Sequence, residues 1–307
     1  MVMRHGRNPI GPQGLLGSYC SLWEAQSTDP ALRVRGGGGI VTTLLAFLLE
    51  RGLIQKALVV GTSSTPPWAE AKFITTPPEA YAAAGSKYQR IAYGALASQV
   101  DARTAVVGLP CQIRAFQERP SVLRLGLFCG INLSWRGIRY YLKQNRVDLE
   151  AVERLDYRAP GGGMLVTLRD GRSLRLPPYA WLAYYFSTEA CLRCTDHTNQ
   201  WADLAIGDRR PEWSTVIVRT AVGQKVLADA IAAGRIVGNE ISLDDYLDRA
   251  TSPLLQKELY GGYVQDPWVR VRGRWIEWVP LRILGFWSHF IQKRHKRLIQ
   301  KFRNKWR

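Results

Sequence analysis

Short apolar runs of strand length alternate with helical patterns over the first half of the chain. The runs at 57–61, 104–108 and 122–128 are mainly apolar, and the first two end in glycine. Segments with apolar residues at helical spacing lie at 40–53 and 135–143. Strands that alternate with helices predict an α/β core in which neighbouring strands pair in parallel.

The pattern changes after residue 150. Two short runs, at 165–169 and 172–176, flank the dipeptide Asp170-Gly171, a strong signal for a two-residue hairpin turn. Two further strands and one helix are expected at 202–207, 215–219 and 222–233. We therefore predict a mixed α/β (α+β) fold, with a central mixed sheet, flanking helices, an antiparallel hairpin insertion and a C-terminal basic helix.

Composition divides the chain into four segments. Residues 1–35 are rich in glycine, proline and polar groups and are expected to be irregular, while 36–240 hold the predicted core domain. Residues 241–280 form a C-terminal extension, and 281–307 a basic amphipathic helix. The N-terminal residues lack the apolar run of a signal peptide, and the longest apolar stretch, 40–49, is too short to span a bilayer. We expect a cytoplasmic protein.

The net charge of +17 is concentrated near the C-terminus. Residues 281–307 contain nine lysines and arginines and no acid, which leaves +8 for the rest of the chain. Apolar residues recur there at helical spacing, at Ile291, Leu298, Phe302 and Trp306. Such a helix either contacts the inner face of an anionic membrane or packs its apolar stripe on the domain. These basic residues are not part of a recognisable nucleic-acid-binding motif, so nucleic acid is not an expected partner.

Four of the five cysteines lie in three short strings. Cys191 and Cys194 form a Cys-x-x-Cys pair, which suits zinc, an iron–sulfur cluster or a redox dithiol. Cys111 and Cys129 each follow a predicted strand, so both are expected at the carboxyl edge of the sheet. The alternative is that these two are small buried hydrophobic residues. Cys20 lacks a nearby partner and is left out of the site.

Three other polar features are less specific. The glycine run 36–39 precedes a predicted helix, and such a turn either binds phosphate through unpaired backbone N–H groups or forms a flexible loop. His197 follows the Cys pair and is expected to be a solvated loop residue, with a role at a metal site as the alternative. Asp203 and Asp208 flank a strand, where each either accepts hydrogen bonds from neighbouring backbone, orients a ligand, or ends the strand in solvent.

The order of these motifs resembles one protein family. The motifs are Gly38-Gly39-Ile40-Val41-Thr42, Ser86-Lys87-Tyr88, Gly108-Leu109-Pro110-Cys111-Gln112, Gly126-Leu127-Phe128-Cys129, the Cys191 and Cys194 pair with Trp201 to Asp208, and Val216 to Thr220. Over roughly residues 10 to 240 the chain is similar to the beta subunits of coenzyme F420 hydrogenases and dehydrogenases, a family that includes hydroxymethyl-chlorophyll a reductases.

The resemblance implies an iron–sulfur flavoprotein oxidoreductase that carries FAD and a 4Fe-4S cluster. Electrons would pass, in either direction, between a ferredoxin or partner subunit, the cluster, the flavin and an organic two-electron substrate, a deazaflavin or another small molecule. The implied cluster ligands are Cys111, Cys129, Cys191 and Cys194. The implied flavin contacts are Gly36, Gly37, Gly38, Gly39, Thr42, Ser86, Lys87 and Tyr88. Lys87 is the implied catalytic residue, because a lysine near the ring stabilises a reduced, anionic flavin.

Two departures from the family pattern limit this implication. Many relatives carry an additional ferredoxin-like unit with further Cys-x-x-Cys repeats, which this chain lacks, and Gly37 stands where relatives commonly have serine. Two other functions therefore stay open. One is a non-catalytic zinc-binding protein whose tail contacts membrane or nucleic acid, and the other is an electron-transfer subunit without flavin. The sequence does not single out a substrate.

Overall fold

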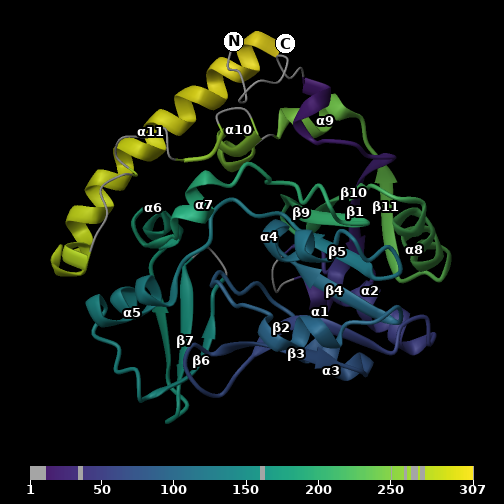
Figure 1. The fold of residues 1–307 in the computed structure, drawn as a ribbon. Coiled ribbons are helices and arrows are strands. Elements are labelled where there is room, and N and C mark those ends of the chain that lie inside the picture. Colours follow the sequence, from purple (N-terminus) through teal and green to yellow (C-terminus); the bar gives the residue numbers. More distant parts are fainter. Residues whose placement is uncertain are drawn as a thin grey trace.

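Strands from both halves of the chain meet in one sheet of this computed structural model (Figure 1). The structure describes residues 12–33, 37–159, 163–249, 251–258, 261–263, 269 and 274–306. Within these residues the main sheet has eight strands, in the spatial order β11 (Ile236–Glu240), β1 (Ser21–Ser27), β10 (Trp213–Val218), β9 (Leu204–Arg210), β5 (Leu123–Leu127), β4 (Thr104–Gly108), β2 (Lys56–Thr62) and β3 (Ala69–Ile74).

The centre of this sheet is parallel. β9 pairs in parallel with β5, β5 with β4, and β4 with β2. β3 is added antiparallel at one edge, and β10, β1 and β11 are added antiparallel at the other. The predicted mixed α/β fold is confirmed, and the parallel centre agrees with the alternation of strands and helices along the chain.

Both faces of the parallel centre are buried. On β2, Val59 faces one hydrophobic layer and Leu58 faces the other. Because successive strand residues point to opposite faces, strands buried on both sides have continuous apolar sequences. The first layer includes side chains of α2 (Ile40–Glu50), α3 (Pro77–Ala82) and α8 (Ala221–Ala232), and the second includes side chains of α4 (Pro110–Ile113), η3 (Arg114–Phe116), α9 (Leu243–Asp248) and α10 (Ser252–Glu258).

The N-terminal region differs from the expectation. Residues 1–11 and 34–36 lie outside the described residues, but the part between them is not irregular, because it contains η1 (Pro12–Leu15), β1 and α1 (Pro30–Arg33). β1 lies between β10 and β11, with Leu22 buried at the sheet. The prediction was wrong because β1 has polar residues at four of its seven positions, and its pairing partners, such as Val218 opposite Ser21, are far away in the sequence.

The predicted hairpin insertion is confirmed, and it forms a small sheet of its own. β6 (Val152–Asp156), β7 (Met164–Leu168) and β8 (Ser173–Leu176) pair antiparallel. Gly171 has a φ of 84° in the turn between β7 and β8, a conformation that glycine adopts without strain. A separate hydrophobic core joins this sheet to α5 (Trp135–Gln144), η4 (Ala180–Leu182) and α6 (Ala183–Phe186).

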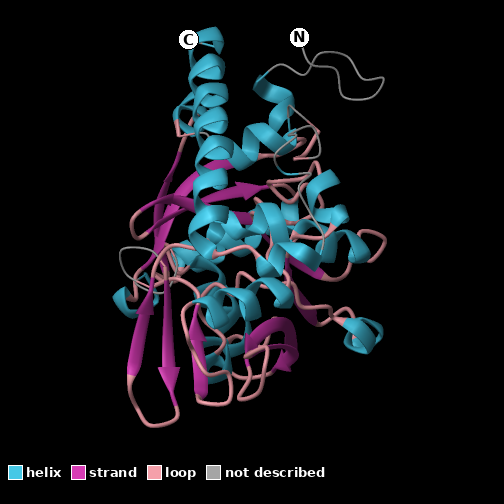
Figure 2. Ribbon diagram, turned by 90° about the vertical axis from the view of Figure 1, so that its left-hand side faces the viewer, coloured by secondary structure: helices cyan, strands magenta, loops and turns pink. Residues whose placement is uncertain are grey.

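The predicted C-terminal helix is present as α11 (Leu281–Trp306), preceded by η6 (Arg274–Trp278). It runs along one side of the molecule up to the C-terminus (Figures 1 and 2). One side of α11 is buried against the domain through Leu284, Ser288, Ile291 and His295. Among the described helices, none combines the length and the apolar composition that a membrane crossing requires.

Asp203 connects three segments at the start of β9. Its carboxylate accepts hydrogen bonds from the Arg124 guanidinium (3.1 and 2.9 Å), the Arg124 backbone N–H (2.8 Å) and the Thr220 hydroxyl (2.9 Å). The side chains of Asp203 and Arg124 are 5% and 13% exposed. Of the roles considered for Asp203, the structure supports the acceptance of hydrogen bonds from neighbouring backbone, since its carboxylate joins neighbouring elements of the fold.

We expect Asp203→Ala to lower the free energy of unfolding by about 3–5 kcal/mol, because it leaves the buried Arg124 guanidinium without its partner. Urea-induced unfolding would measure the change. Asp229→Ala serves as the control, because it removes an exposed pair with Lys225 and should cost roughly 0.5 kcal/mol or less. Equal losses in the two variants would contradict the prediction.

Candidate functional site

A cavity of about 550 Å³ opens at the carboxyl ends of the parallel strands. Residues near the ends of four strands line it, represented by Val60 of β2, Gly108 of β4, Leu127 of β5 and Asp208 of β9. Open α/β sheets bind ligands in the crevice outside this edge, and the volume is typical of small-molecule sites. The topology thus places the cavity where a ligand site is expected.

The glycine run forms one wall of the cavity. Gly38, Gly39 and Thr42 line it, whereas Gly37 does not and Gly36 lies outside the described residues. Gly39 is the N-cap of α2, with a φ of 72° and no side-chain cap. The first backbone N–H groups of a helix lack intrahelical partners, so the start of α2 is suited to a phosphate or another anion.

Close packing requires glycine at these positions. A Cβ on Gly38 would lie 2.7 Å from the Ala25 carbonyl oxygen and 2.8 Å from the Ser214 backbone nitrogen. A Cβ on Gly37 would lie 2.9 Å from Oδ1 of Asp208. On β10, the Ser214 hydroxyl accepts a hydrogen bond from the Gly38 N–H at 3.0 Å.

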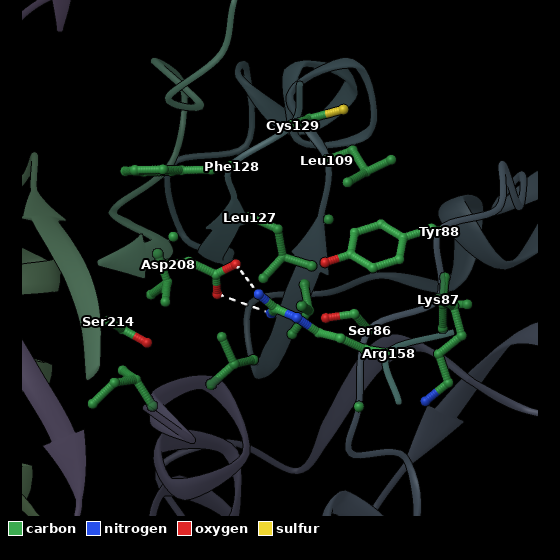
Figure 3. Close-up of a pocket in the computed structure, with 18 of the residues that line it drawn as sticks. Ser86, Lys87, Tyr88, Leu109, Leu127, Phe128, Cys129, Arg158, Asp208 and Ser214 are labelled. Carbon is green, nitrogen blue, oxygen red and sulfur yellow. Dashed lines mark hydrogen bonds and ion pairs between the residues drawn. The ribbon is translucent and has the colours of Figure 1, made fainter. Parts of the chain in front are cut away.

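Ser86, Lys87 and Tyr88 also line the cavity. In Figure 3 the ammonium of Lys87 points away from Tyr88 and Arg158. It donates hydrogen bonds to the carbonyls of Ala83 (2.6 Å) and Ala84 (3.2 Å), just beyond the end of α3. Lysines near a helix C-terminus commonly bind its last carbonyls. The catalytic role of Lys87 stays a prediction.

An ion pair between Arg158 and Asp208 crosses the cavity wall (Figure 3). One of its hydrogen bonds joins Nη1 to Oδ1 at 3.1 Å, and hydrogen bonding to Asp208 raises the pKa of Arg158. Desolvation raises the pKa of the neighbouring Tyr88 hydroxyl. Arg158 was missed in the sequence because it follows a strand of the insertion, far from every recognised motif.

The sheet edge brings the four predicted cysteine ligands into one region. Cys111 follows β4 and Cys129 follows β5, and these strands are parallel neighbours, as predicted. Cys191 lies in α7 (Glu189–Arg193), and Cys194 follows it. The thiols are close enough that Cys194, Cys191 and Cys111 all contribute to the raised pKa of Cys129, although burial is the main cause and brings it to about 12.

The cysteines differ in their surroundings. Cys129 lines the cavity, whereas Cys111 is exposed. Cys191 and Cys194 are half-buried, and neither they nor Cys111 line the cavity. In the part of the chain that the structure describes, no three His, Cys, Asp or Glu side chains converge closely enough to hold a single metal ion. The four thiols therefore form a loose group between the surface and the cavity.

Hydrogen bonds fasten the segment after the Cys pair to the strand ends. The Cys129 N–H donates to the His197 carbonyl at 2.9 Å, and Nδ2 of Asn199 donates to the Gly108 carbonyl at 2.8 Å and the Leu127 carbonyl at 3.2 Å. His197 is buried, which corrects the expectation of a solvated loop residue. Burial lowers the pKa of its imidazole to about 3, so it stays neutral near pH 7.

The C-terminal extension contributes a buried lysine to this region. Nζ of Lys257, on α10, donates to the carbonyls of Cys129 and Asp196, both at 2.8 Å. Burial by itself lowers the pKa of Lys257, but the charges of Cys129 and Cys194 raise it above its usual value. Lys257 was missed because α10 has no sequence motif that connects it with the cysteines.

The fold and the site define an α/β protein with a cysteine group beside a ligand-sized cavity. Residues 22–96 match the profile for the N-terminal part of the coenzyme F420 hydrogenase/dehydrogenase beta subunit, and residues 101–243 match the profile for its C-terminal part. The chain belongs to this family of beta subunits, whose named hydrogenase and dehydrogenase members are parts of oxidoreductases.

Individual relatives agree with this assignment. The coenzyme F420 hydrogenase subunit beta of Methanothermobacter thermautotrophicus is 30% identical over 241 residues, covering 72% of this chain and 84% of the relative. The corresponding protein of Methanococcus voltae is 26% identical, with coverages of 71% and 83%. A chain of the F420-reducing NiFe hydrogenase complex from Methanosarcina barkeri shares the fold, with a TM-score of 0.64, 23% identity and coverages of 81% and 91%.

We expect Gly38→Ala to destabilise the fold by about 1–3 kcal/mol, because its Cβ meets backbone atoms of β1 and β10 that cannot move independently. The loss should appear as a lower midpoint in urea. Gly285→Ala is the control, since a Cβ at this position in α11 would make only an ordinary contact with the Trp181 ring at 3.7 Å and alanine favours the helix. A Gly38→Ala variant as stable as the parent would contradict the close packing described above.

Proposed function

We propose that this protein is an iron–sulfur flavoprotein oxidoreductase that carries a 4Fe-4S cluster and FAD. The observation that carries the proposal is the position of Cys129, which belongs to the four-thiol group and also lines the cavity. A cluster on these cysteines would adjoin a cofactor in the cavity, as one-electron and two-electron chemistry in one protein requires.

The donor set fits an iron–sulfur cluster better than zinc. Four thiols are the usual ligands of a 4Fe-4S cluster, and Cys111, Cys129, Cys191 and Cys194 supply that number. A single zinc ion would draw its four ligands to within about 2.3 Å of one point. A four-iron cube spaces its thiolates farther apart, in agreement with electrostatic coupling among thiols that do not converge on one point.

Three features of the cavity support FAD as its cofactor. Its glycine-lined wall and the uncapped start of α2 suit a pyrophosphate, which binds backbone N–H groups at helix N-termini. Ser86 and Tyr88 supply hydroxyl groups, and the Arg158–Asp208 pair supplies charge at the same wall. When bound, FAD exchanges two electrons with an organic substrate and single electrons with an iron–sulfur centre.

The exposure of the cysteines suggests the side of the protein on which an electron-transfer partner would bind. The exposed Cys111 marks the side on which a ferredoxin or another partner protein would approach, and Cys129 marks the cavity side. The structurally similar Methanosarcina barkeri chain is part of a hydrogenase complex, which supports a partner subunit. We infer that the substrate is a small organic two-electron carrier, and coenzyme F420 is the first candidate because relatives are named for it.

Anaerobic purification tests the proposal directly. The protein should be brown, contain about four iron and four sulfide per chain, and release FAD on denaturation. A colourless protein with one zinc would overturn it in favour of the zinc-binding alternative. A protein with a full cluster that fails to retain FAD after reconstitution would instead be an electron-transfer subunit without flavin.

Replacing a single ligand should remove the cluster. We expect Cys111→Ser and Cys129→Ser each to lose most of the bound iron and the absorption of the cluster, because the weaker serine ligand leaves one iron without its thiolate. Iron and sulfide analysis of the anaerobic protein measures this. Cys20→Ser is the matched control and should keep the full cluster, since Cys20 is exposed and outside the thiol group. Full occupancy in either test variant would refute the assignment of that residue.

The positive charge of Lys257 should raise the midpoint potential of the cluster. We expect Lys257→Met to make its midpoint potential more negative by on the order of 50–100 mV, because removing a nearby buried positive charge disfavours the more negative, reduced state. Lys257→Arg keeps the charge and should restore most of the potential. A potentiometric titration of both variants measures this, and an unchanged potential in Lys257→Met with a full cluster would rule the effect out.

A further inference from the structure

The C-terminal helix has an exposed stripe that the domain does not cover. Ile283, Phe286 and Phe290 are 38%, 62% and 42% exposed on α11. Their spacing of three and four residues puts them on one side of the helix, and the exposed Arg297 and Lys301 continue that side toward the C-terminus. We call these five residues the α11 face.

Packing on the domain uses the other side of α11. Leu284, Ser288, Ile291 and His295 are buried there, and they too follow helical spacing. The sequence left two roles open for this helix, membrane contact and packing on the domain. Ile291, which sequence periodicity assigned to the apolar stripe, faces the domain, so packing uses this side and leaves the α11 face free of the domain. The aromatic residues of the α11 face are additional to the packed side, and Phe286 and Phe290 contact each other edge to face at 5.1 Å.

The charged residues of α11 itself have one sign. Residues 281–307 contain nine lysines and arginines and no acid, so the helix itself offers no compensating carboxylate. Lys293 and Lys296 are also exposed on α11. Just before the helix, Trp278 is 87% exposed. Exposed aromatics on a helix whose own charges are all basic match the composition of helices that lie in the headgroup region of anionic membranes.

We propose that the α11 face binds the surface of an anionic lipid bilayer. Phe286 and Phe290 insert at the boundary between the headgroups and the acyl chains, and the lysines and arginines contact lipid phosphates. An acidic protein would be attracted by the same charges, but it would not need two large exposed aromatic side chains at the start of the stripe. This inference is independent of the cofactors, since it rests on a surface and not on the cavity or the cysteines.

Vesicle co-sedimentation of the full-length protein tests the inference. The protein should bind vesicles of phosphatidylcholine mixed with phosphatidylglycerol, bind phosphatidylcholine vesicles much less, and dissociate as ionic strength rises. The double variant Arg297→Glu with Lys301→Glu should weaken binding by about tenfold or more, given the contribution of each basic residue near such a surface. Phe286→Ser with Phe290→Ser should weaken it by about tenfold through lost apolar burial.

Matched controls separate the α11 face from overall charge and hydrophobicity. Arg175→Glu with Lys225→Glu makes the same charge change on exposed residues of β8 and α8, and Val222→Ser with Val237→Ser removes exposed apolar side chains elsewhere. Both controls should bind like the parent. Absence of binding to anionic vesicles, equal loss in test and control variants, or binding only to an acidic ferredoxin would each overturn the proposal.

Discussion

The side-chain amide of Asn199 holds two strand ends and the cysteine-bearing segment in one arrangement. Its Nδ2 donates to carbonyls at the ends of β4 and β5, so the chain that follows Cys191 and Cys194 is fixed against the strands that lead to Cys111 and Cys129. Asn199 has a φ of 61°, a conformation that asparagine tolerates better than most residues. The grouping of the four thiols depends on this contact, because the two halves of the set are far apart in sequence.

Two basic residues are the second constraint on this region. The Lys257 ammonium, on α10, donates to two backbone carbonyls beside the four thiols. Arg158 pairs with Asp208 in the cavity wall, where charge interactions are stronger than in bulk water. Both basic residues come from segments outside the parallel sheet. The insertion and the C-terminal extension therefore complete a site whose position the sheet alone determines.

The helix α11 combines two roles because its two sides have different neighbours. One side completes the hydrophobic packing of the domain, and the other presents aromatic and basic residues to solvent. If the proposed bilayer contact forms, it would hold the cavity at a fixed orientation to the membrane surface. Amphipathic helices that lie at the headgroup level act in this way.

The sequence by itself determined the features that depend on near neighbours. Apolar runs located β2, β4 and β5, the Asp170-Gly171 dipeptide located the hairpin, and the motif order identified the family. Only the tertiary structure decided the pairing of β1, the burial of His197, the positions of Arg158 and Lys257, and the side of α11 that packs. Turn chemistry and periodicity act over a few residues, whereas strand pairing, burial and charge compensation depend on partners that the fold brings together from distant parts of the chain.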